Sequence, residues 1–207
     1  MYDQLPVESN VRVSLLDLRG NLLDKRESHN VLTNNGAAWL AQLVSSASYA
    51  TDPPTPNTAA RVKYIGLGCG GILQTGAGFF ASQSALVTVV GLEDPVAYTG
   101  VGAGATFLKT ADAQAQNPIY FPTSRRVRFI VDVLETEMSY VGNKAYKSQV
   151  GVETVVPISE AGLYLSSANT TGQDPTLENA LVAYDVFSPM PVTPNNRIRV
   201  EWELRFR

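Results

Sequence analysis

The 207-residue sequence contains one cysteine, one histidine and few charged residues, and each scarcity narrows the possible functions. A single cysteine cannot build an internal disulfide framework or a cysteine-based zinc site. A single histidine, His29, removes most metal sites that use two imidazoles. Charged residues make up 17% of the chain and the net charge is −3, without the basic excess typical of nucleic-acid-binding proteins. We therefore expect no metal, no cofactor and no nucleic-acid partner.

The sequence also lacks long apolar runs. No stretch approaches the roughly 18 residues that a membrane-spanning helix needs, and the first residues lack the basic start and apolar core of a signal peptide. We expect synthesis in the cytosol and no membrane partner. With 44% apolar residues, the composition favours one globular domain over residues 1–207.

The strongest pattern that is present lies at the end of the chain. Between Arg197 and Arg207 every odd position is charged and every even position is apolar. The apolar residues are Ile198, Val200, Trp202, Leu204 and Phe206. A period of two places all of them on one face of an extended strand, with the charges on the other face. This alternation predicts a long core strand in a two-layer β-structure.

Turn-rich segments divide the rest of the chain into further strands. We predict strands at 11–18, 22–29, 62–67, 85–91, 125–133, 144–150, 158–165 and 181–187. Pro189 and Pro191 are expected to end the last of these. One helix is predicted at 36–46, capped by Thr33, Asn34 or Asn35. The expected fold is mainly β, an antiparallel, jelly-roll-like β-sandwich with one short helix and long loops. It comprises an N-terminal hairpin and helix (11–46), a Pro-rich loop (48–60) and a protruding loop or arm (92–122).

A glycine-rich motif follows one predicted strand. Residues 66–71 fit the pattern G-x-G-x-x-G, which in dinucleotide-binding proteins lets the backbone approach a pyrophosphate at a helix N-terminus. Gly76 and Gly78 interrupt the helix that would have to follow, and no further βαβ unit is present. We therefore interpret the motif as a tight or bulged strand end, and Cys69 within it as a small core residue.

The remaining candidates for chemistry are scattered. His29 is the one possible imidazole base, but no G-x-S-x-G elbow accompanies it, and we expect a polar surface or turn role. Glu135 and Glu137, two apart on a predicted strand, are interpreted as a solvated face. Glu160 lies among apolar residues and needs a cationic or N–H partner; we predict a structural lock, for example to an arginine of a neighbouring strand. We expect no catalytic residues.

The sequence also contains a group of basic residues and one glycosylation sequon. Arg125, Arg126, Arg128 and the arginines of the last strand form a basic stripe, but Glu201 and Glu203 lie among them. This mixture favours ion-paired sheet faces or a protein interface over phosphate binding. The glycosylation sequon at Asn169 carries little weight without a secretory signal.

Several segments together resemble small β-rich virion structural proteins of tailed bacteriophages, a group that includes capsid decoration (cement) proteins and tail or collar components. The segments are 30–40, 64–68, 158–164, 181–189 and the alternating final strand. The resemblance implies a non-enzymatic virion protein that associates with itself, with a trimer favoured, and with the major capsid protein or with tail or collar proteins. It further implies that the final strand and the 158–165 strand build the sandwich, while loops 48–60 and 92–122 make inter-subunit contacts.

One alternative comes from another class of function. A carbohydrate-binding β-sandwich needs exposed aromatic side chains beside polar groups on one surface. Tyr98, Tyr120, Tyr140 and Tyr146 are the candidates for that role.

Overall fold

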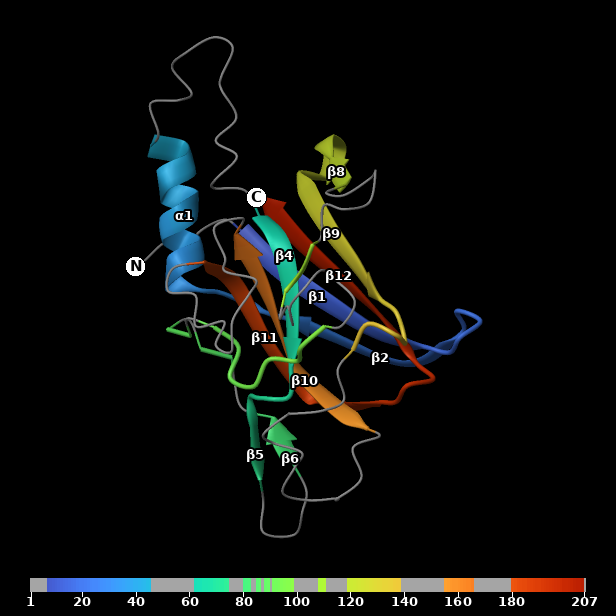
Figure 1. Ribbon diagram of the computed structural model, residues 1–207. Coiled ribbons are helices and arrows are strands. Elements are labelled where there is room, and N and C mark those ends of the chain that lie inside the picture. Colours follow the sequence, from blue (N-terminus) through green and yellow to red (C-terminus); the bar gives the residue numbers. More distant parts are fainter. Residues whose placement is uncertain are drawn as a thin grey trace.

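The computed structural model describes residues 7–45, 62–74, 80–82, 85–86, 88–89, 91–98, 108–110, 119–138, 155–165 and 180–206. Two five-stranded antiparallel sheets pack face to face as a sandwich (Figure 1). The first sheet has the order β2 (Leu22–His29), β1 (Val7–Leu16), β12 (Arg197–Phe206), β9 (Arg126–Val133) and β8 (Ile119–Phe121). The second sheet has the order β3 (Val31–Leu32), β11 (Leu181–Val192), β10 (Val156–Leu165), β4 (Val62–Gly68) and β7 (Lys109–Thr110). A small hairpin pairs β5 (Ile72–Gln74) with β6 (Phe80–Ser82).

The alternating final strand occupies the middle of the first sheet, between β1 and β9. Ile198, Val200, Trp202 and Leu204 are at most 2% exposed, and Phe206 is partly buried against the same core. The Trp202 indole N–H donates to the Ser9 hydroxyl at 2.9 Å, which satisfies the one polar group that this face buries in the core. The period-two pattern therefore predicts the strand and its inward face correctly.

Every residue of β10 is buried, so the second sheet is covered on both of its faces at this strand. One face packs on the first sheet. The other is covered by a smaller apolar cluster in which Leu92 and Leu108 lie with Tyr164 and Tyr184. Val96 and Tyr98 reach the main core itself.

The predicted protruding arm at 92–122 is consequently wrong for residues 92–98, 108–110 and 119–121. These segments belong to the sandwich or cover it. The other residues of that prediction, the Pro-rich loop 48–60 and the predicted strand 144–150 lie outside the described residues.

Two further strand predictions need correction. Residues 85–86, 88–89 and 91 are not in a strand; Ala85 and Val89 pack irregularly on the outer cluster. Pro189 and Pro191 do not end β11, which continues to Val192. They are two apart, so their nitrogens face the same side. Pro191 is in register with Pro157 of β10, a pair in which neither residue has an N–H, while its neighbours Met190 and Val192 are in register with Ile158 and Val156. On its other side β11 pairs with β3 only at Ala183 and Tyr184, so prolines are tolerated on that edge.

The one α-helix of the described residues, α1 (Asn34–Ser45), begins at a cap that also holds it to the second sheet. Of the three predicted caps, Thr33 fills the role: its hydroxyl oxygen accepts the Gly36 N–H at 3.0 Å. The same hydroxyl donates to the Leu181 carbonyl at 2.5 Å. A side chain at Gly36 would meet the Val182 carbonyl oxygen at 2.1 Å, so only glycine allows this close approach.

Candidate interaction surface

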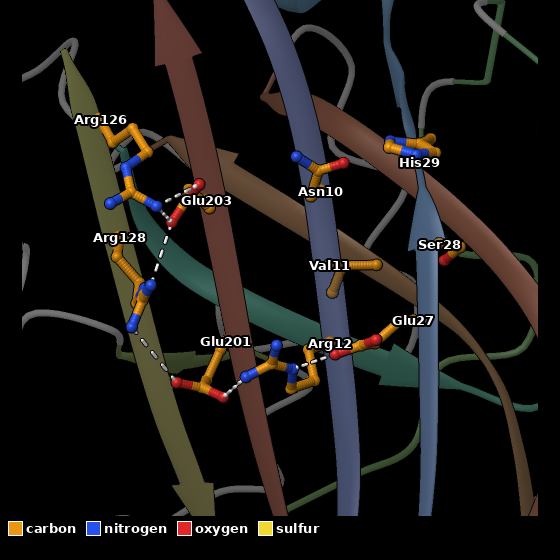
Figure 2. Close-up of a pocket in the computed structure, with 10 residues that line it drawn as sticks. All are labelled: Asn10, Val11, Arg12, Glu27, Ser28, His29, Arg126, Arg128, Glu201 and Glu203. Atoms are coloured by element: carbon orange, nitrogen blue, oxygen red, sulfur yellow. Dashed lines mark hydrogen bonds and ion pairs between the residues drawn. The ribbon is translucent and has the colours of Figure 1, made fainter. Parts of the chain in front are cut away.

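The outer face of the first sheet carries a shallow hollow of about 410 Å³ (Figure 2). Its floor is polar because residues of β1, β2, β9 and β12 alternate between the core and this face. The lining residues are Asn10, Val11, Arg12, Glu27, Ser28, His29, Arg126, Arg128, Glu201 and Glu203.

The charges of this face form one continuous chain of ion pairs across four strands. In order, it runs Lys25, Glu27, Arg12, Glu201, Arg128, Glu203 and Arg126. Figure 2 shows Arg12 between Glu27 and Glu201, with the Arg12–Glu201 pair at 3.3 Å. Arg128 reaches Glu203 at 3.1 Å and Glu201 at 3.8 Å. The lining therefore holds three arginines and three glutamates, which neutralise one another.

This neutral pattern determines what the face can do. The side chains in these pairs are 19–49% exposed, so solvent screening leaves each pair only a small contribution to stability. Hydrogen bonds from Arg12 and Lys25 lower the pKa of the Glu27 carboxyl and keep it ionised. A phosphate would have to compete with three carboxylates for the arginines. The face suits a protein contact with alternating charges better than an anion.

The strand pairing explains why this chain of ion pairs forms. Arg12 on β1 is in register with Glu27 on β2 and with Glu201 on β12, while Glu203 is in register with Arg128 on β9. The sequence predicted that Glu201 and Glu203 lie among arginines, including Arg126 and Arg128. Arg12 and Glu27 were missed as part of this chain of ion pairs, because Arg12 joins Glu27 to Glu201 only through the pairing of the first strand with the last.

The other surface candidates are separate from one another. His29 is exposed at the end of β2, in register with Asn10, and lines the hollow. Glu135 and Glu137 do not share a strand face, because β9 ends at Val133 and a turn follows. Glu135 pairs with Arg197 at 2.7 Å.

The remaining basic and acidic candidates also have local roles. Glu137 pairs with Lys109 and accepts the Leu134 N–H at 2.7 Å. Arg125 adopts a left-handed conformation with φ of +49° after a short 3₁₀ turn (Pro122–Ser124), and its carbonyl accepts the Phe206 N–H at 2.9 Å. Arg125 therefore contributes through its backbone conformation and its carbonyl, and it does not belong to the chain of ion pairs described above.

Glu160 lies fully buried on β10, and its partners are not arginines but backbone N–H groups and a tyrosine. One carboxylate oxygen, Oε1, accepts the N–H groups of Gly70 at 3.0 Å and Asp94 at 2.9 Å. The other, Oε2, accepts the Glu93 N–H at 3.0 Å and the Tyr184 hydroxyl at 2.8 Å. Burial raises the pKa of Glu160, while these four hydrogen bonds act in the opposite direction. The carboxylate ties two irregular segments, 69–71 and 92–96, to the central strand.

The glycine motif at 66–71 is the other half of this arrangement. A Cβ at Gly68 would lie 2.2 Å from Glu160 Oε1, and one at Gly70 would lie 2.7 Å from it. Gly71 has φ of +67°, and its N–H donates to the Glu93 carboxylate at 2.6 Å. A bend and β5 follow the motif instead of a helix. The glycines therefore make room for a carboxylate of the chain itself.

Three further predictions concern single residues. Cys69 is fully buried, and burial raises the pKa of its thiol well above the ordinary value, in keeping with a core residue. Tyr98 is 1% exposed and so is wrong as a sugar-stacking residue, whereas Tyr120 is 64% exposed. Tyr140, Tyr146 and the sequon at 169 lie outside the described residues.

Comparisons with known proteins do not assign a family. No family model matches the chain, and no curated protein or solved structure matches it significantly. Within the described residues, no three His, Cys, Asp or Glu side chains gather as metal ligands would. Among the described residues, no helix combines the length and the apolar character that crossing a membrane requires.

Proposed function

We propose that this chain is a non-enzymatic structural protein of a tailed-bacteriophage virion, and in first place a capsid decoration protein that reinforces the head. The observation that supports the proposal most is where the resembling segments lie. Residues of 30–40, 64–68, 158–164 and 181–189 contribute β3, β4, β10 and β11, which are neighbours in the second sheet. The resemblance therefore concerns one contiguous scaffold rather than scattered matches.

Two surfaces give such a scaffold the means to make contacts. The outer face of the first sheet presents alternating, mutually neutralised charges. At the tip of the β1–β2 hairpin, which projects to the right in Figure 1, Leu18, Leu22 and Leu23 are 48–58% exposed. Exposed apolar side chains gathered at one tip are typical of a protein contact. Contacts of about 1,600 Å², repeated by symmetry, would reinforce a shell through avidity.

The proposal is tested by mixing the purified protein with particles that lack it. Negative-stain images and quantitative mass spectrometry of the washed particles give the site and the copy number. Hundreds of copies on the head are expected. Six or twelve copies at the tail or neck would favour the alternative, a tail, collar or fibre-attachment component. Particles that bind none of the protein would refute both.

Deletion can test the proposed inter-subunit contacts of loop 48–60 but not those of loop 92–122. Removing 92–122 would remove the buried Leu92, Val96, Tyr98 and Leu108 and unfold the sandwich. Deleting 48–60 avoids those core residues. Unchanged particle binding and oligomeric state in that deletion would show that 48–60 makes no inter-subunit contact.

A carbohydrate-binding module remains the alternative from another class. Of its four predicted aromatic residues, Tyr120 is the exposed one among those described. A glycan array without hits would remove this alternative.

A further inference from the structure

Asp185 is a carboxylate buried where the edge strand β2 of the first sheet meets β11 of the second. It lies on β11, is 2% exposed and accepts a hydrogen bond from the Ser28 hydroxyl on β2. Burial raises the pKa of this carboxyl above its ordinary value of 3.8, while hydrogen bonds from Ser28 and from the Val186 N–H act in the opposite direction. The edge strand therefore supplies a donor to a buried acid of the opposite sheet.

The inward face of β2 carries charges, but they do not neutralise this acid. Asp24 and Arg26 face inward with Ser28, as the alternation of half-buried and exposed residues along β2 shows. Arg26 pairs with Asp24, and its Nε donates to the Ser188 carbonyl at 3.3 Å. Among the described residues, none forms an ion pair with Asp185.

The other elements in contact with β11 supply no countercharge either. On β10, Glu160 is the one charged residue, and it faces the outer cluster on the other side of the second sheet together with Tyr164 and Tyr184. The strands β3 and β6 and the helix α1 contain no charged residue. The other titratable residues of β1 and β2 lie on the outer face of the first sheet: Glu8, Arg12, Lys25, Glu27 and His29. Ionised Asp185 is thus a buried charge without a cation, which costs free energy that the neutral acid does not cost.

The strand β2 is the element whose opening brings water to this acid. None of its eight residues is buried, so little apolar surface holds it in place, and its inward face from Asp24 to Ser28 is polar. It lies at the edge of its sheet and pairs with β1 on one side only. Segments with few buried apolar contacts open locally at a lower free energy than global unfolding requires.

We propose that Asp185 makes the closure of β2 over the second sheet depend on pH, so that β2 stays closed while this acid is neutral and opens more readily once it is ionised. The neutral carboxyl keeps its hydrogen bond with the Ser28 hydroxyl and carries no charge into the interior. The ionised carboxylate gains hydration whenever β2 separates from β1 and admits water. This inference goes beyond the proposed function and does not depend on what the chain assembles with.

The direction and size of the effect follow from proton linkage. Because the pKa of Asp185 is higher when β2 is closed than in water, closure is most stable below the ordinary value of 3.8. It loses stability as the pH rises through the closed-state pKa. Between these two pKa values the open population rises by up to about tenfold per pH unit, since opening then releases up to one proton. At higher pH the open population levels off.

Hydrogen exchange of the full chain, read by mass spectrometry from about pH 4 to about pH 8, tests this proposal. After correction for the intrinsic exchange rate at each pH, peptides that cover 22–29 should open more as the pH rises and then level off. Asp185→Asn keeps an acceptor for Ser28 but cannot ionise, so its corrected profile should be flat. Ser28→Ala removes a hydrogen bond to the charged form, so the rise should extend to higher pH.

The matched control is Glu27→Gln, which replaces a carboxyl by an amide on the outer face of the same strand and should keep the rise with pH. Peptides of β12 report global unfolding and should stay more protected than those of β2. The proposal is overturned if the wild-type profile of 22–29 is flat or merely follows that of β12, or if Asp185→Asn keeps the rise. Should Asp185→Asn fail to fold, an unchanged profile in Ser28→Ala overturns it.

Discussion

Replacing Glu160 by glutamine changes one oxygen into an NH₂ group and leaves the shape of the side chain almost unaltered. The amide nitrogen cannot accept a hydrogen bond. Placed at Oε1, it would face the N–H groups of both Gly70 and Asp94. Placed at Oε2, it would face the N–H of Glu93 and the hydroxyl of Tyr184, which can rotate to accept. The better orientation still leaves one buried N–H unpaired, at a cost of about 1–3 kcal/mol.

The pH dependence of this cost follows from burial. A protonated Glu160 keeps its contacts, because its hydroxyl can donate to Tyr184 while both oxygens still accept. Burial raises the pKa of folded Glu160 above its ordinary value of 4.5. The stability that this group contributes is therefore complete below the unfolded-state pKa and is lost as the pH rises through the folded-state pKa. Glu160→Gln removes this dependence, so its cost should be largest at acidic pH and smaller at neutral pH.

Urea unfolding followed by tryptophan fluorescence measures this cost, because Trp202 lies in the core. A loss of about 2 kcal/mol corresponds to a fall of roughly 4–8 °C in Tm for a chain of this size. The matched control is Glu135→Gln, the same chemical change at a surface ion pair, where the loss of stability is expected to be clearly smaller than at Glu160. A Glu160→Gln protein that is as stable as the wild type at acidic pH would refute the four-donor account of the lock.

Three other substitutions have definite expected outcomes in thermal or urea unfolding. Ser9→Ala leaves the buried indole N–H of Trp202 without its acceptor and should cost about 1–3 kcal/mol; no measurable loss would contradict that hydrogen bond. Gly68→Ala forces a Cβ to 2.2 Å from a carboxylate oxygen and should cost more than Gly20→Ala. At Gly20 nothing lies within 4 Å and only the strain of φ at +86°, about 1–2 kcal/mol, applies; the reverse order would be inconsistent with the close packing. Arg125→Gly relieves a φ of +49° and should stabilise by up to about 1 kcal/mol, whereas Arg125→Ala, which keeps the strain, should not.

The parts of the fold that could be predicted from sequence are those encoded by a local period. In β12 and β9 the alternation is a property of the strand alone, so the inward faces of Trp202 and Phe129 follow without knowledge of any partner. The helix start at Thr33 was predictable for the same reason, since a cap is a local hydrogen bond. The two-layer sandwich follows from several such strands that each have one apolar face.

The errors occur where a neighbour, rather than the local sequence, decides the structure. Leu92 and Val96 have no period, yet both are buried. Leu92 packs in the apolar cluster on the outer face of the second sheet, and Val96 reaches the main core, where its N–H donates to the Leu67 carbonyl on β4. Pro189 and Pro191 predict the end of a strand, but β11 continues because the nitrogens of these prolines face a side that β3 leaves free at that point. Both outcomes depend on strand order, which no short pattern encodes.

Glu160 shows why a buried charge is easier to detect in a sequence than its partner. Its isolation among apolar residues predicts a lock, but three of its four donors are backbone N–H groups, and a backbone group leaves no residue type to search for. The indirect signal is the glycine run, because Gly68 and Gly70 stand where any side chain would displace the carboxylate. A glycine run without a following helix and a lone acid on another apolar strand are then two halves of one structure. Together they allow the irregular segment 92–96 to close over the sandwich, where strand pairing alone would leave its N–H groups buried and unpaired.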